Sequence, residues 1–183
     1  MTFKPYSDRL IFFDTEFTHL DAKKGELISI GLVKYSGEEL YFELDFTGEP
    51  HPWVTEKVLP YLKGPKVSRE EAQKRLREFV GPDMPYLVAY VNQFDAIFWY
   101  ELFGSPMDHP AFWIPIDFAS ILFALGYPPD SMGREKFWQE LGLVKQTGVQ
   151  HNALDDARWL WEVYLALQAK SELWEKKEDT TLL

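Results

Sequence analysis

The stretch Leu10-Ile11-Phe12-Phe13-Asp14-Thr15-Glu16-Phe17 decides how the rest of the chain is interpreted. Its four leading apolar residues predict a buried strand, because the run is too short to indicate a helix. Residues two apart in a strand point to the same side, so Asp14 and Glu16 can face a common point. Two carboxylates that close repel unless a cation such as Mg²⁺ or Mn²⁺ lies between them. Alone, an Asp-x-Glu pair is more often a strand that ends in an acidic turn, so the rest of the chain must supply further ligands.

Length and composition set the limits of the interpretation. The 183 residues, 16% of them aromatic, predict one packed domain over residues 1–183. We expect its core at about 9–168 and a flexible tail or partner contact at 171–183. The absence of cysteine excludes disulfides, thiolate zinc sites and cysteine nucleophiles. No signal-like start and no membrane-length apolar run is present, so we expect a cytoplasmic protein with no membrane partner.

Charge restricts the classes of nucleic-acid-binding protein to consider. A net charge of −10 argues against a non-specific nucleic-acid coat. It is compatible with an enzyme whose bound metal ions supply local positive charge. The most basic part of the chain contains Lys57, Lys63, Lys66, Arg69, Lys74, Arg75 and Arg77. Such a run is usually a solvated helix face, and the alternative is a rim that contacts phosphates.

Hydrophobic patterns predict an α/β fold with five strands and several helices. The expected strands are 10–17, 26–33, 39–46, 86–91 and 111–116, the first three antiparallel. The expected helices are 68–80, 96–103, 118–125, 131–141 and one that begins near Ala153. The proline-rich residues 47–67 are expected to be mostly irregular.

Further acidic residues lie where helices are expected to begin. Asp95 follows the fourth strand, where it can cap a helix or present a carboxylate at the strand's carboxyl end. Asp156 flanks the apolar face of the last helix, either as a structural residue near the helix dipole or as a metal ligand. His151, just before that helix, is either structural or placed over a site that includes Asp156. Three polar residues are interpreted as helix caps rather than ligands: Asp117, Asn152 and Asp155.

Together these blocks resemble the motifs of the DEDDh-type 3′→5′ exonucleases. The RNase H-like fold of that family implies a central mixed five-stranded sheet, with three antiparallel strands followed by parallel ones, flanked by helices. The first motif is similar to Asp14-Thr15-Glu16-Phe17, the second to Phe94-Asp95, and the third to His151-Asn152-Ala153-Leu154-Asp155-Asp156-Ala157. The segments 26–31, 53–54 and 58–60 are most similar to the small bacterial exoribonuclease subfamily described from mycobacteria. The chain lacks the histidine that many relatives carry before the second motif, so the role of Asn92 does not transfer.

The resemblance implies a metal-dependent 3′→5′ exoribonuclease that releases nucleoside 5′-monophosphates. Two divalent cations, Mg²⁺ or Mn²⁺, would be held by Asp14, Glu16, Asp95 and Asp156. His151 would be the general base that accepts the proton of the attacking water. RNA is favoured over DNA as the partner, and a homodimer is compatible with the aromatic surplus by analogy.

A terminal base needs an aromatic surface, which binds it without reading sequence. Phe17 is the first candidate, together with the backbone around Thr15, and Trp53, Phe98 and Trp99 follow. Each of these aromatic residues could instead belong to the core. Two other functions stay open: a 3′→5′ DNA exonuclease of the proofreading or repair type, and a catalytically inactive module that binds nucleotides or RNA.

Overall fold

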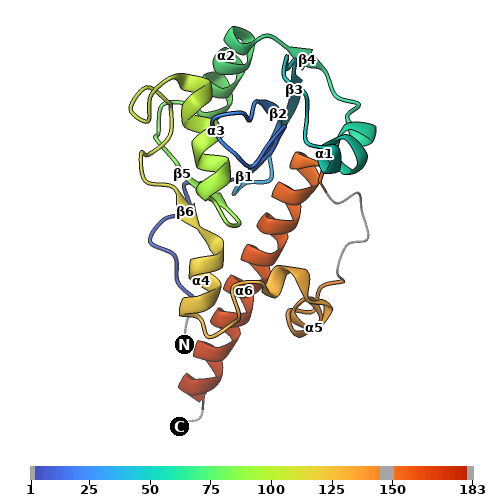
Figure 1. Ribbon diagram of the computed structural model, residues 1–183. Helices are drawn as coiled ribbons and strands as arrows, with labels where there is room; N and C mark the ends of the chain where they lie inside the picture. Colours follow the sequence, from blue (N-terminus) through green and yellow to red (C-terminus); the bar gives the residue numbers. More distant parts are fainter. Residues whose placement is uncertain (1–2, 145–150, 181–183) are drawn as a thin grey trace.

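A mixed sheet of six strands forms the centre of the molecule (Figure 1). The structure, a computed structural model, describes residues 3–144 and 151–180, the stretch 172–180 by its backbone alone. The strands are β1 (Leu10–Phe17), β2 (Leu27–Lys34), β3 (Glu39–Leu44), β4 (Lys66–Val67), β5 (Tyr86–Ala89) and β6 (Ile116–Asp117). Their order is β4-β3-β2-β1-β5-β6. The pairs β1–β2 and β2–β3 are antiparallel and the other three are parallel, so the predicted arrangement is confirmed.

The predicted number of strands was wrong by one. The additional strand, β4, lies in the segment 47–67 that was expected to be mostly irregular, and it pairs with the end of β3. Two residues are too few to leave a periodic hydrophobic pattern in the sequence. The expected fifth strand at 111–116 is reduced to β6, because Pro115 has no N–H to donate to a ladder.

Six α-helices and two 3₁₀ helices cover the described part of the sheet. The α-helices are α1 (Pro52–Lys57), α2 (Arg69–Val80), α3 (Gln93–Phe103), α4 (Phe118–Ala124), α5 (Glu135–Glu140) and α6 (Ala153–Thr180). The 3₁₀ helices are η1 (Leu59–Tyr61) and η2 (Ser131–Gly133), so the helix expected at 131–141 is divided in two. Ser68 caps α2 and Asp117 caps α4, as the sequence predicts. None of these described helices has the length and apolarity needed to cross a membrane.

β1 alternates between two hydrophobic cores, one on each face of the sheet. Ile11 and Phe13 face the core that α2 and α3 complete. Leu10 and Phe12 face the core formed with α4, α5 and α6. Figure 1 shows α3 and α6 on opposite sides of the sheet. By the same alternation, the carboxylates that follow on β1 belong to the α6 face, and Thr15 belongs to the α3 face.

Helix α6 is longer than the sequence pattern indicated. Its backbone is helical through Thr180, so it includes most of the segment 171–183 that was expected as a tail or partner contact.

Candidate active site

The carboxyl end of β1 places two carboxylates beside the start of α6. Asp14 pairs with Gly31 of β2, and Glu16 pairs with Ser29. A Cβ on Gly31 would lie 2.3 Å from the backbone nitrogen of Leu154, so only glycine lets α6 begin this close to the sheet. This contact brings the first turns of α6 over the strand that holds Asp14.

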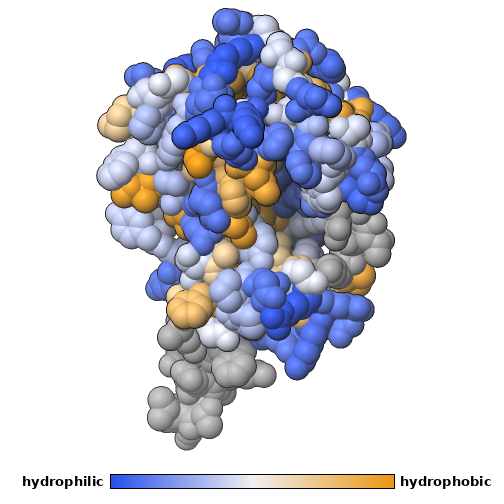
Figure 2. Space-filling view, viewed as in Figure 1, coloured by the Kyte–Doolittle hydropathy of each residue, from blue (hydrophilic) through white to orange (hydrophobic). Residues whose placement is uncertain are grey.

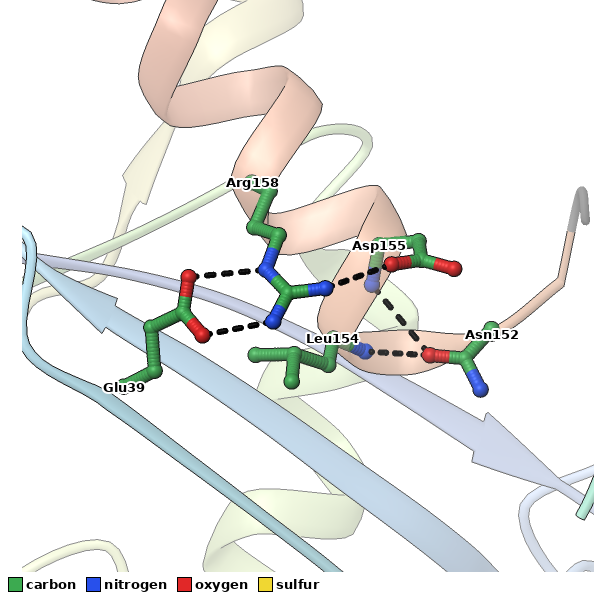
Figure 3. A network of polar contacts seen from close by, with 5 residues as sticks. All are labelled: Glu39, Asn152, Leu154, Asp155 and Arg158. Atoms are coloured by element: carbon green, nitrogen blue, oxygen red, sulfur yellow. Dashed lines mark hydrogen bonds and ion pairs between the residues drawn. The ribbon is translucent and has the colours of Figure 1, made fainter. Parts of the chain in front are cut away.

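A polar network ties the start of α6 to β3 (Figure 3). The Asn152 side-chain oxygen accepts hydrogen bonds from the backbone N–H groups of Leu154 and Asp155, at 3.2 and 3.3 Å, so Asn152 caps the helix as predicted. The Asp155 carboxylate instead binds Arg158 at 2.8 Å. Arg158 also donates two hydrogen bonds to Glu39 of β3, at 2.7 and 2.6 Å. Asp155 is therefore part of this network, and its predicted role as a cap is filled by Asn152.

Asp95 is fixed by Thr15 from the neighbouring strand. α3 begins at Gln93, so Asp95 lies in the first turn of the helix. Of its two candidate roles, that of N-cap was therefore wrong. The Asp95 carboxylate accepts hydrogen bonds from the Thr15 backbone N–H at 2.8 Å and the Thr15 hydroxyl at 2.7 Å. Thr15 is only 4% exposed, and it orients a carboxylate where the sequence analysis expected it to touch substrate.

His151 and Asp156 are held together at the start of α6. The His151 backbone N–H donates to the Asp156 carboxylate at 3.1 Å, and His151 has a left-handed backbone with φ of 70°. Its ring lies edge-on to Trp53 of α1, with the ring centroids 4.6 Å apart. Glu16, His151 and Asp156 each offer a ligand atom, and these atoms lie within 4.8 Å of one another. Two carboxylates and an imidazole are a donor set that fits a divalent cation.

Burial raises the pKa of all four predicted carboxylates, and repulsion by neighbouring carboxylates adds to it for Asp14, Glu16 and Asp156. The pKa of Asp14 lies well above its usual value because of burial and then the charges of Asp95, Asp156 and Glu16. Burial, followed by the charges of Asp156 and Asp95, raises the pKa of Glu16 to about 8. Burial is also the main cause that raises the pKa of Asp95 and of Asp156 to about 7. Such a cluster is stable at neutral pH when it holds protons or a cation.

These residues open into a cleft of about 760 Å³. Its described lining consists of Asp14, Thr15, Glu16, Phe17, His19, Leu20, His51, Trp53, Val54, Tyr90, Val91, Phe94, Asp95, His151 and Asp156. The structure thus brings together all four predicted carboxylates and the predicted histidine. None of the described lining residues is Lys or Arg. The sequence analysis missed His19 and His51, although three of the chain's four histidines line this one cleft.

The aromatic candidates divide into two groups. Phe17 and Trp53 line the cleft, and Trp53 is 44% exposed. Phe98 and Trp99 were wrong candidates for substrate contact, because they are 1% and 0% exposed and pack in the core. Phe98 instead stacks on Phe17, with the ring centroids 4.4 Å apart, and so supports the cleft wall. Figure 2 shows hydrophobic side chains gathered in the middle of a face that is otherwise mostly hydrophilic.

None of the Lys and Arg residues of the basic segment is among the described residues that line the cleft. Several of its charges are paired within the chain, namely Lys57 with Glu56, Lys66 with Asp45, Arg69 with Glu101, and Arg75 with Glu71. This agrees with the interpretation of a solvated helix face, and the cleft depends on other groups for positive charge.

Sequence comparison matches this chain to no family model and to no curated protein. Structural comparison finds similar folds in crystal structures of E. coli exonuclease I. A zinc-bound complex with single-stranded DNA has a TM-score of 0.62 and 15% identity, and the match covers 89% of this chain and 40% of that one. A structure that addresses processivity has a TM-score of 0.65 and 14% identity, with 87% and 40% covered. A complex with a dT13 oligonucleotide has a TM-score of 0.62 and 14% identity, with 91% and 42% covered.

These matches agree with the predicted fold class, a mixed α/β fold whose sheet has antiparallel and then parallel strands and is flanked by helices. The chain spans about two fifths of the length of the exonuclease I structures that it matches. At 14–15% identity, the likeness is one of fold alone.

Proposed function

We propose that this chain is a metal-dependent 3′→5′ exonuclease of the DEDDh type. It would hydrolyse the last phosphodiester bond of a nucleic acid and release a nucleoside 5′-monophosphate. The observation that carries the proposal is the convergence of four carboxylates from β1, α3 and α6 in a cleft whose described lining contains no Lys or Arg. Such a cleft repels a phosphate unless cations are bound in it, so the phosphate and the cations must bind together.

Asp14, Glu16, Asp95 and Asp156 would hold the two divalent cations, Mg²⁺ or Mn²⁺. Bound there, such cations neutralise charge on the phosphate and favour formation of the hydroxide nucleophile at neutral pH. Thr15 keeps the Asp95 carboxylate in place through two hydrogen bonds, and the His151 backbone N–H does the same for Asp156. The Asp95 and Asp156 carboxylates thus have hydrogen bonds that do not depend on the cation content of the cleft.

His151 would act as the general base. Burial lowers its pKa, which favours the neutral ring that can accept a proton from the attacking water. The edge-on contact with Trp53 limits the orientations of the ring. A ring nitrogen of His151 also lies within 4.8 Å of a carboxylate oxygen of Glu16 and of Asp156, so His151 could itself be a metal ligand. Experiment has to separate this role from that of a general base.

RNA is the first candidate substrate, because the sequence resemblance extends to an exoribonuclease subfamily. DNA is the second candidate, because structures with the same fold hold single-stranded DNA and a dT13 oligonucleotide. Digestion of 3′-labelled RNA and DNA of the same sequence, side by side, separates the two. Faster release of nucleotides from RNA supports an exoribonuclease. Faster release from DNA supports a DNA exonuclease of the proofreading or repair type.

The proposed function is tested with wild type and Asp14→Asn in parallel on a 3′-labelled oligonucleotide. Wild type should release mononucleotides with Mg²⁺ or Mn²⁺ and none in EDTA, and Asp14→Asn should release none in any condition. Binding of the oligonucleotide without release in either metal would overturn the proposal in favour of an inactive binding module.

A further inference from the structure

Two histidines in the cleft have no part in the proposed chemistry. His19 lies in the loop after β1, and His51 lies at the N-terminus of α1. Both line the cleft, and their rings meet edge-on with centroids 5.3 Å apart and an interplanar angle of 88°. His51 is exposed and His19 is partly buried, so neither serves as a core residue.

The backbone fixes the position and the tautomer of His51. Its N–H donates to the Thr18 carbonyl at 2.9 Å, and its Nδ1 accepts a hydrogen bond from the Trp53 N–H at 3.2 Å. Because Nδ1 is an acceptor here, the neutral ring carries its proton on Nε2. His51 therefore offers an Nε2–H donor on an anchored ring.

The histidine pair is an incomplete metal site. The grouping of three ligand atoms found among the described residues is that of Glu16, His151 and Asp156, and no third ligand atom joins His19 and His51 in such a group. Two imidazoles beside apolar side chains fit a ligand that accepts or donates hydrogen bonds. A small-molecule pocket commonly has this composition, with apolar walls and a few polar groups that set specificity.

The direction of attack indicates which part of the substrate lies beside these histidines. In phosphoryl transfer the attacking and leaving oxygens are roughly in line on opposite sides of phosphorus. His151, the base, marks the attacking side, and Trp53 of α1 contacts its ring. α1 thus lies away from the departing strand. The nucleoside that stays on the phosphate is the 3′-terminal one. Trp53 and Leu20 both line the cleft, and Trp53 lies on the side of His151.

We propose that His19 and His51 hydrogen-bond the edge of the 3′-terminal nucleobase, between apolar walls formed by Trp53 and Leu20. This inference rests on the proposed exonuclease function and adds a specificity determinant to it. The anchored Nε2–H of His51 favours terminal bases that present an acceptor at that position. The pair sets which terminal nucleotide the enzyme releases fastest.

His51→Asn is the variant that isolates this role. Asn is a strong N-cap residue, so its side-chain oxygen can replace Nδ1 at the start of α1, whereas the Nε2–H donor is lost. His19→Ala removes the second ring. Leu20→Ala serves as a matched control, because it shortens an apolar wall and leaves both histidines in place. It should weaken binding of all four bases alike. Thermal unfolding of each variant checks that the fold is retained.

The assay compares kcat/KM on oligonucleotides that end in each of the four bases with kcat/KM on one that ends in an abasic residue. On its preferred base, His51→Asn should lose about three- to tenfold, the effect of one hydrogen bond. The loss of kcat/KM on the abasic end should be several times smaller. The differences in kcat/KM among the four terminal bases should also become smaller.

An equal loss on base-containing and abasic ends would overturn the inference, because the histidines would then contact the sugar or a phosphate. An unchanged spread among the four bases in both histidine variants would overturn it as well. Absence of turnover by wild type on every substrate is a different result, since it would contradict the exonuclease function itself.

Discussion

Gly31 of β2 lies against the backbone of Ala153 at the first residue of α6. A Cβ added to Gly31 would come within 2.4 Å of the Ala153 carbonyl carbon, closer than atoms approach without displacement. Gly31 is also the residue opposite Asp14 in the sheet. One missing side chain therefore sets the distance between the β1 carboxylates and those on α6.

Gly31→Ala should displace the start of α6 and separate Asp156 from Asp14. We expect a loss of about 1–3 kcal/mol in the free energy of unfolding, as for other overpacked sites, and a fall in turnover larger than the stability loss explains. Gly133→Ala is the matched control, because a Cβ there meets nothing within 4 Å. Denaturant titration and nuclease assays measure both effects. Unchanged activity in Gly31→Ala would show that the site tolerates a shifted α6.

The metal-free protein should lose stability as pH rises. Folding raises the pKa of Glu16 from 4.5 to about 8, and that of Asp95 and Asp156 from 3.8 to about 7. A raised pKa means that the folded state binds more protons than the unfolded state within this window. The contribution of these protonated carboxyl groups to the free energy of unfolding is complete below about pH 4 and is lost as pH rises to about 8.

Asp14→Asn should therefore raise the Tm at pH 8 in EDTA, because it removes one of the repelling charges, and change it less at pH 4. Divalent cations should raise the Tm of wild type more than that of the variant. Asp83→Asn, at an exposed position, is the control for net charge. Calorimetry at the two pH values measures the effect, and a lower Tm for Asp14→Asn at pH 8 would contradict it.

Replacement of His151 separates a base from a ligand. His151→Asn suits the experiment, since asparagine tolerates the left-handed backbone at this position better than alanine does. If His151 is the base, turnover should fall by about 10²- to 10⁴-fold while the affinity for Mn²⁺ is retained. Isothermal titration gives the affinity and single-turnover kinetics the rate. A parallel loss of Mn²⁺ affinity would identify His151 as a ligand.

Arg158→Ala should loosen the start of α6 with little change in overall stability. Arg158 and Glu39 are 39% and 37% exposed, so solvent screening keeps the stability loss at about 1 kcal/mol or less. The fall in turnover should be larger than this loss of stability explains, because the network in Figure 3 ties α6 to β3. Arg134→Ala breaks a comparable ion pair with Asp130 outside this network and is the control. Equal activity of the two variants would argue against a positioning role for Arg158.

Interactions between near neighbours in the sequence were predictable. The alternation of β1, with Asp14 and Glu16 on one side, follows from the two-residue period of a strand. The caps formed by Ser68, Asp117 and Asn152 depend on backbone N–H groups two or three residues away. Strand alternation and helix caps are determined by short segments of sequence. The carboxylates and the histidine of the candidate site lie at the ends of such strands and helices.

Contacts between distant segments were decided only by the tertiary structure. Phe98 and Trp99 have the composition of a base-binding surface, yet α3 turns them into the core. No sequence pattern links His19 and His51, which are thirty-two residues apart. They meet because the His51 backbone N–H donates a hydrogen bond to the Thr18 carbonyl. The sequence by itself determined which groups can do chemistry and which strand or helix bears them. Which of these groups share one cleft depends on long-range packing, since no local pattern specifies how the ends of β1, α1, α3 and α6 approach one another.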